Sequence, residues 1–408
     1  MNLKYILLIA GVWSGGMFVS SPFYGRAKQK IQAQSDGAYV RSIVEYLASD
    51  ELAGRYPGTK GDTLAMQFIL DKFKSFGLES SVRPFGIKKD SCTTFNVAGI
   101  LKGKEDKYIV VGAHYDHLGY GGKGSGSRTP DTLAIHNGAD DNASGVSAVI
   151  KLAQIYSGKD EPPVGLVFAA FGAEEKGVIG SKEFAENPPV PREKILAMFN
   201  FDMVGNLRNG SVSLGGTGTA KGLDSLIDIA KEQYPGLRIA KSKDGVGPSD
   251  HTSFYAKNIP VLYFSTGATM DYHTPADDAC KLNYRGIDSV VCFASELLDI
   301  VSAQPALVFT ESGSANAAPM RASFKVTLGL MPDVTGQVEN GLRADVVIKG
   351  KPAHTAGMKN GDIITEINGM AVKDIEGYMK CLGTLKAGEK AKIKVKRGEE
   401  VMLLDVQL

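Results

Sequence analysis

Residues 164–171 read VGLVFAAF, a run without a polar side chain, and the sequence GAEE follows at once at 172–175. A run of this length with no polar alternation is typical of a strand that is buried on both faces of a sheet. Further strand-like runs, several of them continuously apolar, lie at 94–103, 108–114, 195–205 and 259–266. These runs predict the strands of one central sheet.

Segments with helical periodicity lie between the strand-like runs. Apolar residues recur at helical spacing in the segments 37–49, 63–76, 143–157, 221–233 and 286–302. Strand and helix therefore alternate along the chain. This pattern predicts the α/β class, with a central, mostly parallel sheet that is covered by helices on both faces.

The composition excludes some classes of function. The net charge of the 408 residues is +1, so no basic face is available to attract nucleic acid or an anionic membrane. The chain has four cysteines and none forms a CxxC pair, so a cysteine zinc site is not supported. Their spacing leaves disulfides and buried free thiols equally open. The cysteines are Cys92, Cys280, Cys292 and Cys381.

Two stretches, residues 1–34 and residues 305–321, differ in composition from the rest of the chain. Residues 1–34 begin with one lysine and a short apolar run, which predicts a secretory signal peptide or an uncleaved N-terminal anchor. We therefore expect an exported protein that is periplasmic, secreted or anchored at the cell surface, with membrane contact only if this segment is retained. Residues 305–321 are rich in Ala, Ser and Pro, and they predict a linker between domains at 35–304 and 322–408.

Five motifs rich in acids and histidine lie at or near the C-terminal ends of predicted strands, where open α/β sheets place their sites. They are VVGAHYDH (110–117), GADDNASG (138–145), FGAEEKG (171–177), NFDMVG (200–205) and DYHTPAD (271–277). Singly, each fits a structural role such as a turn, a helix start or a buried histidine. Together they would crowd carboxylates that repel one another and raise one another's pKa. Bound cations relieve this repulsion, and imidazole and carboxylate ligands without thiolate suit zinc, with manganese or cobalt as weaker options.

The five motifs, in this order, resemble those of the co-catalytic di-zinc aminopeptidases of metallopeptidase family 28. The resemblance covers residues 36–303 and implies the zinc exopeptidase fold and two zinc ions. It implies that His114 and Asp202 bind one zinc and that Glu175 and His273 bind the other. Asp140 would bridge both ions, and the peptide bond after the bridging acid would be cis.

The resemblance also assigns residues that do not bind metal. Glu174 would be the general base, and Asp116 would hold the second ring nitrogen of His114. Asp250, in PSDHTSF, would support the site or contact substrate, or it would simply cap the helix that follows. The glycine-rich loop 119–136 is expected to form a rim or flap over the cleft. His117, His136 and His251 receive no role.

The C-terminal segment resembles a bacterial PDZ domain. The resemblance rests on FKVTLGLMPD at 324–333 and on PAHTAGMKNGDIITEINGMAV at 352–372. It implies a small β-rich unit, with little helix, that binds an extended peptide or protein segment along a sheet edge. A packing or dimerisation module without a ligand remains the alternative.

Three hypotheses about function follow. The first is an exported zinc aminopeptidase that hydrolyses N-terminal residues from peptide substrates. The second is a glutaminyl cyclase, which uses the same scaffold with a single zinc. The third is an inactive peptidase-like protein that binds partners through its PDZ-like unit.

Overall fold

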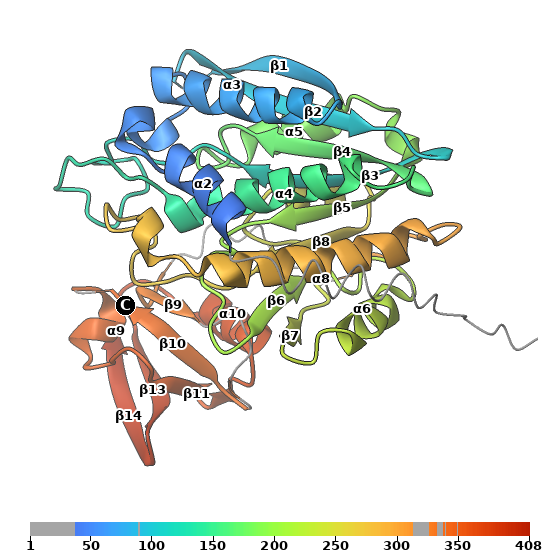
Figure 1. Cartoon of the computed structure of the whole chain (residues 1–408). Coiled ribbons are helices and arrows are strands. Elements are labelled where there is room, and N and C mark those ends of the chain that lie inside the picture. The colour runs from blue at the N-terminus through green and yellow to red at the C-terminus, as the bar shows by residue number, and fades with distance from the viewer. Residues whose placement is uncertain (1–36, 89, 313–325, 333–337, 339, 349) are drawn as a thin grey trace, which may run out of the picture. The chain divides into compact units, whose positions relative to one another are not determined.

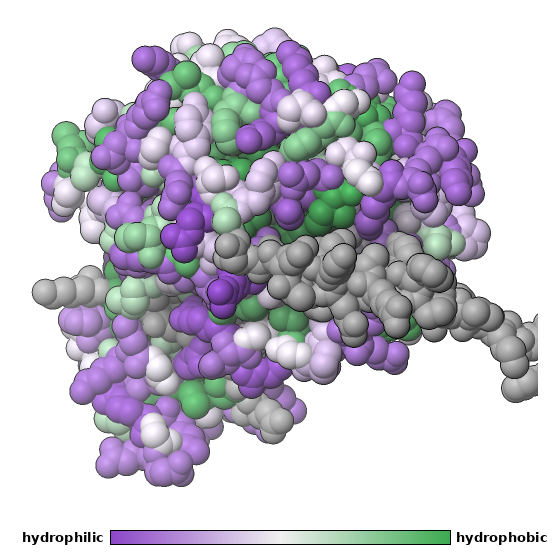
Figure 2. All heavy atoms as spheres, in the orientation of Figure 1, coloured by the Kyte–Doolittle hydropathy of each residue, from purple (hydrophilic) through white to green (hydrophobic). Residues whose placement is uncertain are grey.

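The computed structural model describes residues 37–88, 90–312, 326–332, 338, 340–348 and 350–408. The expected signal segment, residues 1–34, lies outside this part of the chain. Two units with separate hydrophobic cores are described, one before residue 313 and one after residue 325. Within the described ranges, no helix is both long enough and apolar enough to span a membrane. Figure 2 shows mainly hydrophilic side chains on the visible face, with apolar residues in scattered groups.

An eight-stranded sheet forms the centre of the first unit, in the order β1-β2-β4-β3-β5-β8-β6-β7 (Figure 1). In chain order the strands are β1 (Glu79–Ile87), β2 (Cys92–Leu101), β3 (Glu105–His114), β4 (Val164–Phe171), β5 (Ile195–Phe201), β6 (Ser211–Gly215), β7 (Arg238–Lys241) and β8 (Val261–Ser265). The central strands β4, β3, β5 and β8 pair in parallel, as predicted. Antiparallel pairs join β1 to β2, β2 to β4, and β6 to β8, so the sheet is mixed toward its edges.

Apolar runs in the sequence predicted five of the eight strands, but β6, which is also fully buried, was missed because serines interrupt its run. Every residue of β4 is buried, which explains its unbroken apolar run. The strands β1, β6 and β7 were not predicted. β1 and β7 lie at the two edges of the sheet and are largely exposed or half-buried, so they carry no continuous apolar signal.

Helices cover both faces of this sheet. They are α2 (Ala38–Leu47), α3 (Lys60–Ser75), α4 (Gly145–Ser157), α5 (Ile179–Glu186), α6 (Leu223–Glu232), α7 (His251–Tyr255) and α8 (Tyr284–Ser302). Figure 1 shows α2, α4 and α8 over one face. Phe184 of α5 and Phe254 of α7 belong to the core of the opposite face. The short helix α5 was not predicted, whereas α7 is the helix that was expected to follow Asp250.

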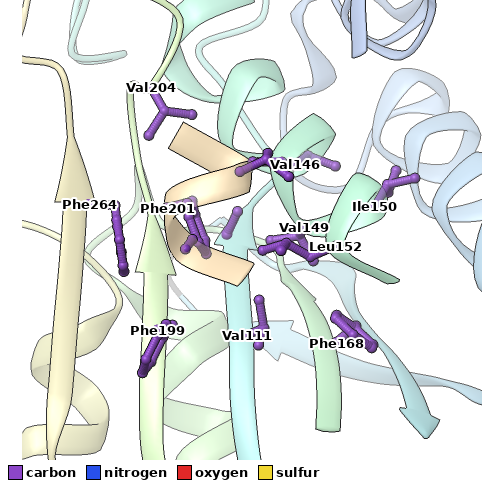
Figure 3. Close-up of a cluster of buried hydrophobic side chains, with 14 of the residues drawn as sticks. Val111, Val146, Val149, Ile150, Leu152, Phe168, Phe199, Phe201, Val204 and Phe264 are labelled. Carbon is purple, nitrogen blue, oxygen red and sulfur yellow. The ribbon is translucent and has the colours of Figure 1, made fainter. Parts of the chain in front are cut away.

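Adjacent strand residues point to opposite faces, so each strand contributes to both cores. Val111 faces α4, whereas its neighbour Val110 belongs to the other core. Figure 3 shows Val146 and Val149 of α4 next to Phe201 and Val111 of the sheet. Because α4 begins at Gly145, the last residue of the GADDNASG motif, this packing anchors the segment that carries the two acids.

The second unit is the small β-rich body that the sequence predicts, but it also contains a regular helix. Its elements are β9 (Leu330–Pro332), β10 (Leu342–Val347), α9 (Pro352–Thr355), β11 (Ile363–Ile367), β12 (Met370–Ala371), α10 (Ile375–Thr384), β13 (Lys390–Arg397) and β14 (Glu400–Gln407). The expectation of little helix overlooked α10. Asp374 caps α10 by accepting a hydrogen bond from the Gly377 amide at 2.8 Å, and Tyr378 and Leu382 bury one face of the helix.

The start of the predicted linker belongs to the first unit. Phe309 pairs with Ala220 in an isolated bridge, and the amide of Thr310 donates to the carbonyl of Thr219 at 2.8 Å. The hydroxyl of Tyr255 donates to the carbonyl of Ser312 at 2.9 Å. Residues up to 312 are therefore held against the first unit, and residues 313–325 lie outside the described chain.

Candidate metal centre

The predicted ligands meet at the carboxyl edge of the parallel strands. His114 is the last residue of β3, Glu175 follows β4, and Asp202 comes directly after β5. His273 lies in the loop after β8. Parallel strands bring their carboxyl ends to one edge, which is why residues far apart in the sequence become neighbours.

A first group of metal-ligand atoms forms around His114. Its Nε2 atom lies 3.3 Å from Oδ1 of Asp141 and 3.6 Å from Oδ1 of Asp202. All three side chains are buried. Together they form a set of three donors that could hold one metal ion.

A second group uses the other oxygen of the same aspartate. Oδ2 of Asp141 lies 3.1 Å from Nε2 of His273, and that nitrogen lies 3.0 Å from Oε1 of Glu175. Nδ1 of His117 lies 3.2 Å from the same Glu175 oxygen. Asp141 therefore stands between two ligand groups, with one carboxylate oxygen directed to each.

The central carboxylate is Asp141 and not Asp140, which is a correction to the expected ligand set. Oδ1 of Asp140 accepts a hydrogen bond from the Gly205 amide at 2.8 Å, and Oδ2 accepts one from the Asn206 side chain at 2.7 Å. The hydroxyl of Ser144 also donates to the Asp140 carboxylate, at 3.2 Å. Asp140 thus supports the segment after Asp202, while its neighbour faces the histidines. The bond after Asp141, Asp141–Asn142, is the cis peptide.

The carboxylate of Asp116 contacts the backbone of the two glutamates and not the ring of His114. Its Oδ1 accepts a hydrogen bond from the Glu174 amide at 2.8 Å, and its Oδ2 accepts one from the Glu175 amide at 3.2 Å. The carboxylate lies 3.8 Å from Nδ1 of His114, beyond hydrogen-bond range, whereas the carbonyl oxygen of Asp116 lies 3.3 Å from that nitrogen. Asp116 therefore positions the backbone that carries Glu174 and Glu175.

Glu174 is buried beside the ligands but belongs to neither donor group. Its carbonyl oxygen accepts hydrogen bonds from the amides of Gly177 and Val178, each at 2.8 Å, in a tight turn. This turn and the carboxylate of Asp116 fix the backbone of Glu174 from both sides. A carboxylate held next to ligands without binding the ion has the placement that a general base needs.

Asp277 supports the GADDNASG segment and received no role from the sequence. Its two carboxylate oxygens accept hydrogen bonds from the amides of Asp140 at 2.9 Å and Asp141 at 3.0 Å. Burial, together with the nearby charge of Asp140, raises the pKa of Asp277 to about 8. The only signal in the sequence was its place at the end of the motif DYHTPAD.

Arg55 is a second supporting residue that the sequence did not indicate. Its guanidinium is fully buried and donates to the carbonyls of Tyr115 at 2.6 Å, Asn137 at 2.7 Å and Gly138 at 2.9 Å. It also donates to the carbonyl of Leu47. Burial lowers the pKa of Arg55 to about 10. One side chain thus ties the segment after His114 to the segment before Asp141.

We expect Arg55→Met to lower the free energy of unfolding of the first unit by about 3–5 kcal/mol, because four carbonyls lose their buried donor. Buried carbonyls that lose their donor cost about 1–3 kcal/mol each. Arg192→Met, at an exposed position, is the matched control and should change stability by less than about 0.5 kcal/mol. Chemical denaturation measures both, and equal stability of the two variants would contradict the structural role of Arg55.

The charges of the site favour a bound cation. Burial raises the pKa of Asp116 to about 7 and that of Asp140 to about 6. Burial acts in the same direction on Glu175, but the charge of His273 together with hydrogen bonds to His117 and His273 outweighs it and lowers the pKa of Glu175 to about 2. Burial disfavours the charged form of His114, yet hydrogen bonds to Asp141 and Asp202 raise its pKa well above the usual value. The raised pKa values of His114 and His273 favour protons beside the carboxylates, and a metal ion would replace such protons on binding.

The donor atoms also fit zinc. They are imidazole nitrogens and carboxylate oxygens, which zinc accepts at about 2.0–2.2 Å in tetrahedral sites. Such bonds place neighbouring donors about 3.3 Å apart. The separations of 3.0–3.6 Å between the histidines and carboxylates of the predicted set agree with this spacing.

Asp250, His136 and His251 lie outside both donor groups. Asp250 is fully buried at the start of α7, and its side chain makes no capping hydrogen bond to that helix. His251 stacks on Tyr263 with ring centroids 4.6 Å apart, and burial lowers the pKa of His251 to about 3. His136 lies 2.8 Å from the hydroxyl of Ser127.

The glycine-rich loop 119–136 is fastened to the loop that carries His273. The carbonyl of Gly126 lies 3.0 Å from Nδ1 of His273, and the amide of Arg128 donates to the carbonyl of His273 at 2.9 Å. The Arg128 guanidinium donates to the carbonyl of Met270 at 2.9 Å. Because Nδ1 faces Gly126, Nε2 is the His273 nitrogen that is directed to the metal position.

The first unit matches a known protein family. The family model described as "Peptidase family M28" matches residues 96–327, which is more than half of the 408-residue chain. The chain belongs to peptidase family M28. A PDZ domain model matches residues 330–408, so a PDZ domain follows the M28 unit.

Named relatives of this M28 chain include enzymes. It is 26% identical over 309 residues to leupeptin-inactivating enzyme 1 from Streptomyces exfoliatus, and the match covers 72% of this chain and 65% of that enzyme. The chain thus spans less than two thirds of that relative's length.

Solved structures show that the M28 unit has the fold of two kinds of enzyme. An aminopeptidase from Aneurinibacillus sp. strain AM-1 matches with a TM-score of 0.55 and 18% identity, over 70% of this chain and 97% of that one. Porphyromonas gingivalis glutaminyl cyclase matches with a TM-score of 0.56 and 19% identity, over 65% and 98%. The fold is therefore shared by both, and the site residues must distinguish the two functions.

Proposed function

We propose that this M28 protein is a zinc-dependent aminopeptidase that removes N-terminal residues from peptides. One observation carries the proposal: Asp141 directs its two oxygens to two separate donor groups, with Glu174 buried next to them. A glutaminyl cyclase needs one zinc, so the cyclase hypothesis does not explain why a second complete donor group is present. A binding protein without activity needs neither Glu174 nor either group.

The mechanism assigns a role to each part of the site. Zinc held by the two groups would supply Lewis acidity toward the scissile carbonyl and toward the attacking water. Glu174 would take a proton from that water and return it to the leaving amine as the peptide bond breaks. Asp116 holds the backbone of Glu174, so the carboxylate is in place before substrate arrives.

A panel of synthetic peptides tests the proposal. The purified zinc-loaded protein is incubated with peptides that have free N-termini, with N-acetylated copies of them and with one peptide that begins with glutamine. Mass spectrometry should show stepwise shortening from free N-termini and no change in the acetylated copies. Loss of ammonia from the glutamine peptide without shortening would establish a cyclase. No reaction in any peptide would favour the binding-protein hypothesis.

We also propose that the chain is exported, on the strength of the apolar segment near its start. Trp13 is the one tryptophan of the sequence, so removal of residues 1–34 would leave a protein without indole fluorescence. Indole emission from protein purified out of the native host would show instead that the segment is retained. For the PDZ domain we propose an extended peptide as ligand.

A further inference from the structure

His117 lies at the second donor group, although it received no role from the sequence. Its side chain is fully buried. Nδ1 of His117 lies 3.2 Å from Oε1 of Glu175 and 3.8 Å from Oδ2 of Asp141. Nε2 of His273 approaches the same two oxygens at 3.0 and 3.1 Å. Two imidazole nitrogens therefore lie close to one pair of carboxylate oxygens.

The imidazole of His117 is held in this position by its surroundings. A Cβ atom at Gly138 would lie 2.5 Å from both Cγ and Cδ2 of His117, so the glycine packs directly against the ring. The amide of His117 donates to the carbonyl of Arg55 at 3.4 Å. The ring also meets that of His273 edge-on, at 70° and with centroids 5.6 Å apart. These contacts pack the ring against the donor group.

The polar contacts of His117 are concentrated at one nitrogen. In the part of the chain that the structure describes, its buried Nε2 atom has no hydrogen-bond partner. Nδ1 instead faces two carboxylates. The side chain is therefore oriented by what lies at Nδ1, and Asp141, Glu175 and His117 form a set that could hold a metal ion.

We propose that His117 supplies a further nitrogen donor, Nδ1, to the second metal position. The inference rests on the two-metal site of the proposed aminopeptidase, but not on the identity of its substrate. With His117, the second position has four protein donors, whereas the first has three. Zinc sites with three protein ligands keep a position open for water or substrate, and four-ligand sites are closed. The first position, at His114, would then be the one that receives the substrate carbonyl.

Cadmium-113 NMR of the full-length, cadmium-substituted protein tests this proposal without substrate. The unmodified protein should give two signals. In His117→Ala, one signal should shift because a nitrogen donor is lost, and the other should stay in place. The affinity for the ion at the second position should fall by at least about tenfold, the lower limit for loss of residues that lie behind metal ligands. His136→Ala removes a buried histidine that faces Ser127, so it should change neither signal.

X-ray absorption on the zinc-loaded, unmodified protein provides a measurement that does not depend on a variant's folding. Three imidazoles shared between two zinc ions are expected, against two if His117 is not a ligand. A count of two, or unchanged cadmium signals in His117→Ala, would overturn the proposal and reduce His117 to a hydrogen-bond donor to Glu175. A single cadmium signal in the unmodified protein would instead count against the two-metal site of the proposed function.

Discussion

Asp141→Asn should strip zinc from both positions, whereas Asp140→Asn should leave both ions bound. Asp141 directs one oxygen to His114 and the other to His273, and an amide replaces one of these oxygens with an NH2 group that cannot bind a cation. The substitution also removes the negative charge shared by the two groups. The loss of zinc affinity should exceed the ~10–100-fold that is typical for residues lying behind metal ligands.

The neighbouring acid provides a matched control for this experiment. Asparagine at 140 keeps an oxygen that can accept the hydrogen bond from the Gly205 amide. Its new NH2 group faces the side chain of Asn206, whose amide can turn to offer its oxygen instead, so the local structure should persist. Zinc content after dialysis, measured by mass spectrometry of the metal, separates the two variants. Retention of zinc in Asp141→Asn together with its loss in Asp140→Asn would reverse the assignment of the central carboxylate.

Glu174→Gln should reduce kcat/KM for peptide hydrolysis by about 10²–10⁴-fold, the usual contribution of a general acid–base group. Glutamine fills the same space as glutamate but cannot accept a proton at neutral pH. Zinc content should remain that of the unmodified protein, because Glu174 is not part of either donor group.

Two further measurements define the outcome for Glu174. Glu175→Gln is the comparison, since it alters a ligand and should lower the zinc content as well as the rate. Full activity in Glu174→Gln would exclude Glu174 as the base. Loss of zinc in that variant would make Glu174 a ligand, so its effect on the rate could not be assigned to proton transfer.

The strands that could be predicted are those whose buried residues form a continuous apolar run in the sequence. The run 164–171 coincides with β4 because both faces of this strand are covered. Edge strands such as β7 (Arg238–Lys241) are short and half-exposed, so they have neither an apolar composition nor a regular alternation of apolar and polar residues. The mixed direction of the outer strands also leaves no local signal, because strand direction is decided by connections and not by residue type.

The metal centre was predictable to the level of motifs but not of neighbouring residues. Residues at strand ends, such as His114 and Asp202, meet because parallel strands share an edge. The choice between Asp140 and Asp141 depends on the backbone of a tight turn, where no helical or strand period says which side chain faces the histidines. Arg55 and His117 act through contacts with segments far along the chain, and these contacts exist only after folding.

The route by which the donor groups are assembled has a consequence for biosynthesis. The second group needs Asp141 from the turn before α4, Glu175 after β4 and His273 after β8, so its members span much of the first unit. Closing such long stretches of chain is among the slow steps of folding. A nascent chain that stops before residue 273 cannot form this group. The capacity to hold the second ion therefore reports that the whole sheet, through β8, has been completed.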